Sequence, residues 1–433
     1  MTTIEEQPKI KLGDYIIIQR QKYTKLQKFG HLDATAMLGK DQLELKALLD
    51  QPYGATFKMC PKEDLGKSHR GRQRLNTLEL CSELEMRNIR EVLGISQSGE
   101  DNRHIKDDGD SQALKPEDIE QLRDECSEST KIIEKIVENS KTFHSKTEYS
   151  QEKYLKKKEK KYFEFVQIRQ PTIRLITEIY YRQDAEKVMG IRVDTLSQLI
   201  SYSGISAFGN YLLYESGSNG LLPAAFLNSM GANTEALLVH MHPGNVPQKQ
   251  AVLALNLPEE QLNRCISVNI YSVLREFYQG TSDTTKESEV AEPSTKKQKL
   301  SEEESAPEET QDEKLPETST KPTPQKWRIE NQRAVDLIHA KFDSLVIASK
   351  EHPSNLVKEL LPFVKPSRPV VIFSLSKEIL MELYVELKTG SKVTNLHLTS
   401  NWLRMYQILP NRTHPEVNMQ ANSGYLLTGY TLG

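Results

Sequence analysis

Two different hydrophobic patterns divide the chain. Up to about residue 96, short apolar runs such as 14–20 (Asp-Tyr-Ile-Ile-Ile-Gln-Arg) recur between turns that contain glycine or proline. Runs of β-branched residues with such punctuation favour strands, and their close spacing favours a small antiparallel barrel or sandwich. We therefore expect a β-rich, barrel-like N-terminal domain over residues 1–96.

The second pattern begins near residue 163, where strand-like and helix-like segments alternate. The expected strands are 163–168, 211–214, 235–240, 344–348 and 369–373, with two more around 403–409 and 425–427. The expected helices are 173–181, 221–230, 269–278 and 331–341. Such alternation is typical of a layered α/β domain, so the fold class is α+β multidomain with a Rossmann-like domain over 163–433.

Three further segments differ from both patterns. Residues 97–128 and 281–326 are too polar for a core and are predicted to be an acidic flexible loop and a disordered insertion. In 131–139, apolar residues recur on one side of a helix. The following 141–162 holds eight lysines against three glutamates, so 129–162 is predicted to be a basic helical connector.

Charge is unevenly distributed along the chain. The 57 Lys and Arg and 60 Asp and Glu give a net charge of −3 over 433 residues. Residues 97–128 carry −7 and residues 281–326 carry −5, which leaves +9 on the remainder. A basic folded body attracts phosphate backbones, so a nucleic-acid partner is the first hypothesis that charge suggests.

Composition excludes other classes. No stretch approaches the roughly 20 apolar residues that span a bilayer, so no membrane association is expected. The first residues lack the basic-then-apolar plan of a secretory signal. The four cysteines, Cys60, Cys81, Cys126 and Cys265, contain no C-x-x-C pair and are typical of reduced thiols in a cytosolic or nuclear protein.

The most informative segment is 211–221, Tyr-Leu-Leu-Tyr-Glu-Ser-Gly-Ser-Asn-Gly-Leu. A strand, a glycine-bearing turn and a helix start form the place where α/β folds bind nucleotides. The turn is similar to the E-x-G-x-G-x-G turn of S-adenosylmethionine-dependent methyltransferases, whose glycines let the backbone approach the cofactor. Here the sequence holds Glu215, but the glycine positions read Gly217, Asn219 and Leu221, and we expect Leu221 to crowd the cofactor.

Two further positions depart from that class. An acid that would hold the ribose hydroxyls at the end of the second strand is replaced by His240-Met-His242. In the catalytic tRNA adenosine N1-methyltransferases the fourth strand resembles D-A-V-F-L-D-L-P; Ala348 stands where the second Asp would face the base. Alanine neither accepts a proton nor hydrogen-bonds an adenine. No catalytic residues and no cofactor in this chain are therefore predicted.

The chain resembles the non-catalytic subunit of the eukaryotic tRNA (adenine-N1)-methyltransferase that modifies adenosine 58. The motifs that carry the resemblance are Lys146-Thr-Glu-Tyr-Ser-Gln-Glu-Lys-Tyr-Leu-Lys-Lys-Lys158, Arg192-Val-Asp-Thr-Leu196, Glu215-Ser-Gly-Ser-Asn-Gly220, Arg404-Met-Tyr-Gln-Ile-Leu-Pro-Asn-Arg-Thr-His-Pro415 and Gly424-Tyr-Leu-Leu-Thr-Gly429. The resemblance implies a β-barrel domain, an inert methyltransferase fold, and a heterotetramer with a catalytic paralogue. It also implies that this chain binds tRNA while the partner holds S-adenosylmethionine.

Basic clusters supply candidates for RNA contact. The candidate residues are Lys153, Lys156, Lys157, Lys158, Lys160, Lys161, Lys67, Arg70, Arg72, Arg74, Arg404 and Arg412. On a helix, lysines 156, 157, 160 and 161 cover one side and suit a phosphate backbone, although a solvated helix face gives the same pattern. For Lys67, Arg70, Arg72 and Arg74, a solvated loop without RNA contact is an equal alternative. For Arg404 and Arg412, the alternative is a structural role at a sheet edge.

Two smaller features complete the candidates. His240 and His242 lie on one side of a strand, but no further Cys or His stands at ligand spacing, so no metal site is predicted. The cluster 296–299 (Lys-Lys-Gln-Lys) is a weak nuclear-import signal, with a chance cluster as its alternative, and nuclear localisation is expected.

Three functional hypotheses follow. The first is an inert, tRNA-binding structural subunit that positions tRNA for a catalytic paralogue. The second is an active S-adenosylmethionine-dependent RNA methyltransferase with a divergent turn. The third is an RNA-binding, translation-associated scaffold.

Overall fold

The computed structural model describes most of the two expected domains. The described residues are 8–39, 41–61, 74–81, 114, 118, 129–140, 143, 150, 151, 153–155, 165–280, 326–408 and 413–432. The predictions for the acidic loop at 97–128 and for the insertion at 281–326 therefore fall almost wholly outside the described part of the chain. Lys326 is the first residue of a helix.

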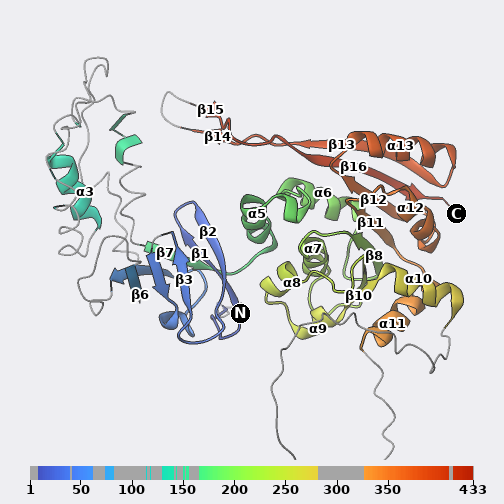
Figure 1. The fold of residues 1–433 in the computed structure, drawn as a ribbon, viewed down its shortest axis with the longest axis horizontal. Helices are drawn as coiled ribbons and strands as arrows, with labels where there is room; N and C mark the ends of the chain where they lie inside the picture. The colour runs from blue at the N-terminus through green and yellow to red at the C-terminus, as the bar shows by residue number, and fades with distance from the viewer. Residues whose placement is uncertain are drawn as a thin grey trace, which may run out of the picture.

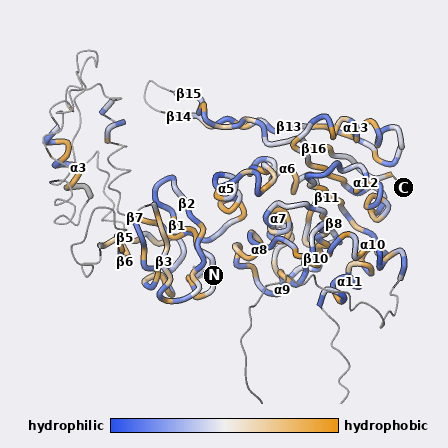
Figure 2. The backbone as a smooth tube through the Cα atoms, in the orientation of Figure 1, coloured by the Kyte–Doolittle hydropathy of each residue, from blue (hydrophilic) through white to orange (hydrophobic). Residues whose placement is uncertain are grey.

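The first sheet contains seven strands around one hydrophobic core. They are Tyr15–Arg20 (β1), Tyr23–Lys28 (β2), Thr35–Leu38 (β3), Asp41–Glu44 (β4), Thr56–Pro61 (β5), Arg74–Leu80 (β6) and Phe165–Arg169 (β7), in the order β2-β1-β7-β5-β6-β4-β3. Hydrophobic and hydrophilic segments alternate along these strands (Figure 2), as expected for a sheet with one buried face. The Lys25 ammonium donates to the Met37 carbonyl at 2.7 Å, which joins edge strands β2 and β3 and makes the sheet barrel-like.

Strand β7 changes the expected domain boundary. It lies between β1 and β5 in the first sheet, although its position in the chain suggested the α/β domain that follows. Val166 and Ile168 are buried in the first core, and the alternate residues Phe165, Gln167 and Arg169 are not. This alternation of buried and exposed residues suits a strand of either sheet, so only the strand pairing shows to which sheet β7 belongs. The second domain therefore begins after β7 rather than at residue 163.

The second sheet is doubly wound. Its strands are Asn210–Glu215 (β8), Leu237–His242 (β9), Cys265–Asn269 (β10), Ser344–Ala348 (β11), Pro369–Ser374 (β12), Val393–Trp402 (β13) and Asn422–Thr431 (β16). The order is β10-β9-β8-β11-β12-β16-β13, with the first five strands parallel and β16 antiparallel to both of its neighbours. The switch point between β8 and β11 defines a Rossmann-like topology and confirms the predicted fold class.

Helices cover both faces of the second sheet (Figure 1). One face carries Ile173–Gln183 (α5), Val193–Ser203 (α6), Leu221–Met230 (α7) and Gln250–Ala254 (α8). The other carries Ile270–Gln279 (α10), Lys326–Ala340 (α11), Ser354–Leu360 (α12) and Lys377–Thr389 (α13). Other helices in the described part of the chain are Ser129–Glu138 (α3), Glu259–Asn263 (α9) and the short 3₁₀ helices Lys46–Leu48, Glu186–Val188 and Leu361–Phe363. None of the described helices combines the length and apolar character needed to cross a bilayer.

The hairpin β13–β16 continues into a thin extension, which we call the arm (residues 402–408 and 413–422). Its short strands Tyr406–Gln407 (β14) and His414–Pro415 (β15) pair antiparallel. In Figure 1 the arm runs from the second sheet along the top of the molecule toward the side on which the first sheet lies. Residues 403–409 were expected to add a strand to the main sheet; the described residues 403–408 form part of the arm instead, and β13, which was not predicted, is the edge strand.

The two sheets are joined by polar and apolar contacts. The Asn256 side chain accepts from the Tyr15 N–H and donates to the Tyr15 carbonyl, both at 2.8 Å. The Arg182 guanidinium donates to the Thr24 carbonyl and lies over the Tyr23 ring. These contacts tie α5 and the chain after α8 to the β1–β2 hairpin.

The base of the arm is pinned by Arg192, in one of the motifs singled out above. Its buried guanidinium pairs with Asp194 at 2.6 and 2.8 Å and donates to the carbonyls of Gln420 and Ala421 at 2.8 and 3.0 Å. Hydrogen bonding to Asp194 is the main reason that the pKa of Arg192 is raised. Ser423 adds two bonds, accepting from the Arg192 N–H and donating to the Gly190 carbonyl. The 192–196 motif and the segment just before the 424–429 motif, distant in sequence, therefore form one polar cluster.

We predict that Arg192→Ala destabilises the second domain by about 3 kcal/mol, because it leaves Asp194 and two carbonyls without their partner. Urea unfolding of the purified chain measures this. Arg174→Ala removes an exposed pair with Glu178 and serves as the control, with a change below about 0.5 kcal/mol. Equal effects from the two variants would contradict the assigned role of the cluster.

Candidate functional site

The turn after β8 lies at the carboxyl edge of the sheet, beside the switch point. It runs from Ser216 to Gly220 and leads into α7. Gly217, Asn219 and Gly220 adopt φ values of +131°, +59° and +75°. Glycine tolerates this region and asparagine does so better than most residues, so the turn keeps its shape although one glycine is lost.

The carboxylate of Glu215 is buried at the end of β8, with only 2% of the residue exposed. The Ser218 hydroxyl donates to it and in turn accepts from the Leu222 N–H at 3.2 Å. The His240 Nε2 lies 3.2 Å from the other carboxylate oxygen, at an angle unsuited to a hydrogen bond. Other side chains of this protein therefore already surround Glu215, the acid that the polar groups of a cofactor would contact.

Gln248 closes the turn from outside. Its Oε1 accepts from the Asn219 N–H at 2.7 Å, and a Cβ on Gly220 would lie only 2.7 Å from the Gln248 carbonyl. The loop between β9 and α8 therefore packs directly on the backbone that a nucleotide would approach. No sequence motif marked Gln248, because its contact depends on the path of this loop.

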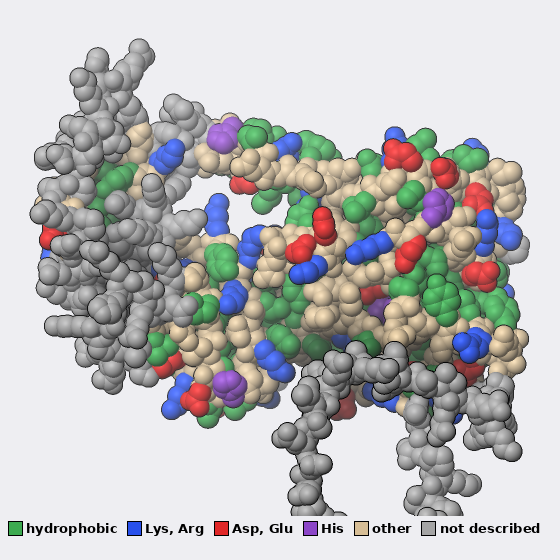
Figure 3. All heavy atoms as spheres, in the orientation of Figure 1, with side chains coloured by type: hydrophobic (Ala, Val, Ile, Leu, Met, Phe, Trp, Pro, Cys, Tyr) green, Lys and Arg blue, Asp and Glu red, His purple; other side chains and the backbone are tan. Residues whose placement is uncertain are grey.

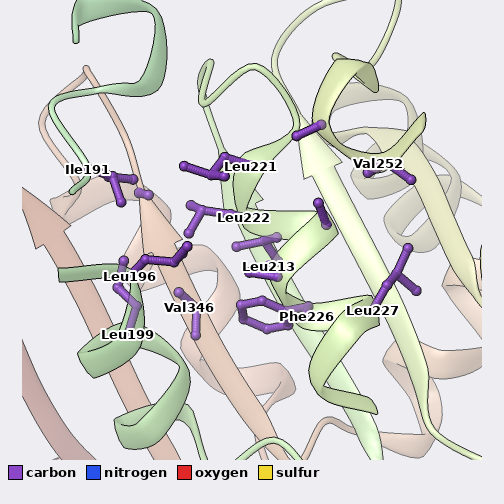
Figure 4. Close-up of a cluster of buried hydrophobic side chains, with 14 of the residues drawn as sticks. Ile191, Leu196, Leu199, Leu213, Leu221, Leu222, Phe226, Leu227, Val252 and Val346 are labelled. Atoms are coloured by element: carbon purple, nitrogen blue, oxygen red, sulfur yellow. The ribbon is translucent and has the colours of Figure 1, made fainter. Parts of the chain in front are cut away.

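Leu221 has a different role from the one expected. Its side chain is fully buried in the core between the sheet and helices α6 to α8, together with Leu222 and Phe226 (Figure 4). It therefore points into the core and does not crowd the outer side of the turn. The crowding comes instead from Gln248 and its loop.

The end of β9 carries two buried imidazoles. The ring centroids of His240 and His242 are 5.6 Å apart, and His240 Nδ1 lies 3.4 Å from the Ser267 hydroxyl. Burial, followed by the neighbouring His240, lowers the pKa of His242 to about 4, so this side chain is neutral at physiological pH. A neutral imidazole lacks the charge of the ribose-binding acid. Within the described residues, no group of three potential ligands stands close enough to hold a metal ion.

The end of β11 lacks a carboxylate facing the turn. Ala348 is buried and pairs in register with Glu215, and the following Lys350 N–H donates to the Ser216 hydroxyl at 2.6 Å. The nearest acid along the chain, Glu351, hydrogen-bonds the Tyr214 hydroxyl. Burial, with this contact, raises the pKa of Tyr214. The Glu351 carboxylate and the Tyr214 hydroxyl are therefore engaged with each other in a structural contact.

These residues do not fit S-adenosylmethionine. The turn N–H at Asn219 already has a partner in Gln248, and Glu215 has Ser218 and His240 beside it. Binding would require the Gln248 loop to leave and the buried carboxylate to exchange its partners, both of which cost free energy. The geometry thus gives no route for methyl transfer on this chain.

The described residues include few of the candidates for RNA contact. Lys153 is exposed on a helical segment. Arg404 donates to the Glu416 carbonyl at 2.8 Å across the arm, which favours its structural alternative. Arg74 begins β6, and its side chain is not described. Outside the described residues lie Lys156, Lys157, Lys158, Lys160, Lys161, Lys67, Arg70, Arg72 and Arg412.

The sheet order and the strand–turn–helix at the switch point define a Rossmann-like protein of the methyltransferase class, with a turn closed by its own loop. Within that class, the model of the Gcd10p family matches residues 9–314, and the chain belongs to this family.

Curated relatives agree with this assignment. A Mus musculus protein named tRNA (adenine(58)-N(1))-methyltransferase non-catalytic subunit TRM6 is 31% identical over 97% of this chain and 88% of its own length. The Dictyostelium discoideum protein of the same name is 29% identical over 97% and 79%. Among solved structures, a SAM-dependent O-methyltransferase from Thermotoga maritima aligns with a TM-score of 0.48 at 8% identity, covering 98% of this chain and 95% of that one.

We predict that restoring the third glycine does not restore cofactor binding. Leu221→Gly removes a fully buried side chain and places glycine at a helix start, at a cost of about 3–5 kcal/mol, while Gln248 still covers the turn. Thermal unfolding should show the loss, and calorimetry with S-adenosylmethionine should show no heat of binding for either form. Micromolar binding by the wild-type chain would contradict the closed turn.

Proposed function

We propose that this chain acts as the non-catalytic subunit of a tRNA (adenine-58-N1)-methyltransferase, binding tRNA and positioning it for a catalytic paralogue. One observation carries this proposal: the cofactor turn keeps its shape but is closed by Gln248, in a chain that matches relatives of that name over nearly all of its length. A closed turn on an intact fold suits a subunit whose task is to bind rather than to catalyse.

The proposal that the chain binds RNA is supported by its charge. Outside the two acidic segments the chain carries +9, and 141–162 concentrates eight lysines. Lys153, in the described part of that segment, is exposed. Opening the tertiary contacts that bury a base in folded RNA costs a few kcal/mol, and binding surface shared between two subunits would supply it.

We also propose that the arm binds the catalytic subunit. Its large apolar side chains are exposed: Trp402 69%, Met405 54%, Tyr406 54%, Ile408 78% and Val417 82%. Figure 3 shows open space beneath part of the arm, so the other described residues do not cover it there. A two-stranded ribbon is marginally stable alone, and exposed apolar patches mark interaction sites.

The finer features of the assembly are also proposals. We infer a heterotetramer with two copies of each subunit, S-adenosylmethionine in the partner, and nuclear localisation with the lysines at 296–299 as the import signal. The resemblance supports the first two, and composition supports the third.

We predict that reversing Lys156, Lys157, Lys160 and Lys161 to Glu weakens tRNA binding by the co-purified complex and flattens its salt dependence. On duplex nucleic acid each lost phosphate contact lowers the slope of log K against log salt by about 0.9. Anisotropy titrations at several salt concentrations measure both. As a matched control, Lys286, Lys296, Lys297 and Lys299 to Glu should leave the slope unchanged; an unchanged slope in the first variant would remove this lysine-rich segment from the RNA surface.

A second prediction concerns the arm. Ile408→Glu together with Val417→Glu places two charges in the apolar contact and should reduce recovery of the catalytic subunit in a pull-down at least about tenfold. Because both side chains are almost fully exposed, the unfolding midpoint of this chain should not change. Val246→Glu, equally exposed at 81% but outside the arm, is the control. Wild-type recovery with the arm variant would exclude the arm as the contact.

The same purification separates the other hypotheses. Turnover by this chain without a partner would establish an active enzyme with a divergent turn. Strong binding of unrelated RNA with no stoichiometric methyltransferase partner would favour the translation-associated scaffold.

A further inference from the structure

A cavity of about 490 Å³ lies at the edge of the second sheet that is opposite to the closed turn. It is formed where β8, β11 and β12 begin, by the end of α6, the 206–209 loop, Asp343, the 367–369 turn and Tyr430. The closed turn follows the other end of β8, about 17 Å away at a rise of about 3.3 Å per residue. The cavity is therefore separate from the site described above.

The floor of this cavity is rigid. The buried Tyr211 hydroxyl donates to the Phe208 carbonyl at 2.6 Å and accepts from the Ser206 N–H at 2.8 Å, which fixes the 206–209 loop. Gly209 has a φ of +105°, and a Cβ there would lie 3.0 Å from an Asp343 carboxylate oxygen. Such a preformed loop loses little conformational freedom on binding.

The rim of the cavity is aromatic and exposed. Phe208, Tyr430 and Tyr202 are 67%, 45% and 44% exposed, and all three line the same cavity. These three rings come from three separate elements and together present apolar surface to water, which is typical of an interaction site. Aromatic faces of this kind stack on nucleobases, and this stacking is tolerant of sequence.

The charge at the cavity is positive. The Asp343 carboxylate accepts from the Asn210 N–H and pairs with Lys365 and Arg368 at 2.9 and 3.2 Å. Burial alone would raise the pKa of Asp343, but these partners lower it below its usual range, so the acid is ionised and matched. Two cations against one carboxylate leave one positive charge. Arg368 is half-exposed, and its single ion pair among the described residues leaves other N–H groups for a ligand.

We propose that this cavity binds one unpaired nucleotide of an RNA strand. The exposed rings of Phe208, Tyr202 and Tyr430 supply the aromatic surface on which the base stacks, and the Arg368 guanidinium donates to a phosphate oxygen. The inference rests on the proposed RNA-binding function and adds a second contact region, distant along the chain from the lysine-rich segment 141–162.

A nucleotide fits these observations better than an apolar peptide or a ligand cation does. A peptide anchor needs a desolvated apolar pocket, whereas hydroxyls of Ser201, Ser206 and Ser367 and the Arg368 guanidinium line this one. A cation would meet the excess positive charge of Lys365 and Arg368. Stacking rings beside a guanidinium and hydroxyl groups are the means by which proteins bind unpaired RNA bases.

The test uses the complex of the full chain with its catalytic subunit, a labelled single-stranded uridine oligonucleotide and tRNA. Phe208→Ala should weaken oligonucleotide binding at least about fivefold, the lower end of the loss expected for one stacked base. Arg368→Gln should lower the salt slope by about 0.7, one phosphate on a single strand. Tyr271→Ala, an aromatic residue 71% exposed on α10 and outside the cavity, is the matched control. A 4-thiouridine oligonucleotide should cross-link to the peptide that contains Phe208.

The outcomes separate this inference from the proposed function. If the wild-type complex fails to bind tRNA, the proposed function fails and the cavity inference with it. If tRNA binds, the lysine reversal weakens it, and Phe208→Ala and Arg368→Gln match the wild type, then only the cavity inference is overturned. Loss of the catalytic subunit from Phe208→Ala would show that the cavity holds protein. If inorganic phosphate competes as effectively as unlabelled oligonucleotide does, the cavity is a simple anion site and the inference is overturned.

Discussion

The buried carboxylate of Glu215 is the constraint on which the functional edge of this protein depends. A carboxylate away from water needs hydrogen bonds or opposite charge, and here the Ser218 hydroxyl donates a hydrogen bond to it. Ser218 also accepts from the first turn of α7, so the same side chain holds the turn and begins the helix. The loop that carries Gln248 then rests on this turn. The turn that would bind a cofactor in a catalytic relative is thus covered by a loop of this chain itself.

Once that edge is closed, the surfaces left for function lie elsewhere on the same sheet. The antiparallel pair β13–β16 extends into the arm, held at its base by Arg192, and exposes apolar side chains. The amino edge of the parallel strands holds an open, aromatic and positively charged cavity. The Rossmann-like fold thus supports both of the proposed binding surfaces, which is the arrangement expected of a subunit that positions a substrate for another chain.

Sequence patterns predicted the regular elements best where burial is continuous. Helix α7 and strand β11 have the bounds expected, because almost every residue in them is buried and the neighbouring glycines and polar residues mark their ends. Helix α13 and strand β13 were missed; β13 is half-exposed, which blurs its alternation. Strand β7 was assigned to the wrong sheet, since a period of two does not say which strands will pair. The prediction that Leu221 crowds the cofactor was wrong for a related reason, because helix phase and packing decide the direction of a side chain.

The sequence by itself determined the fold class, the altered cofactor turn, the missing acids at His242 and Ala348, and the distribution of charge. These properties depend on local composition and on residues at fixed spacing, so they can be read along the chain. Only the tertiary structure decided that Gln248 closes the turn, that Arg192 pins the arm, and that Tyr202, Phe208, Arg368 and Tyr430 line one cavity. The hydrogen bond of Gln248 to Asn219 and those of Arg192 to the arm join residues 29, 228 and 229 positions apart, and their existence depends on how loops and strands pack in space.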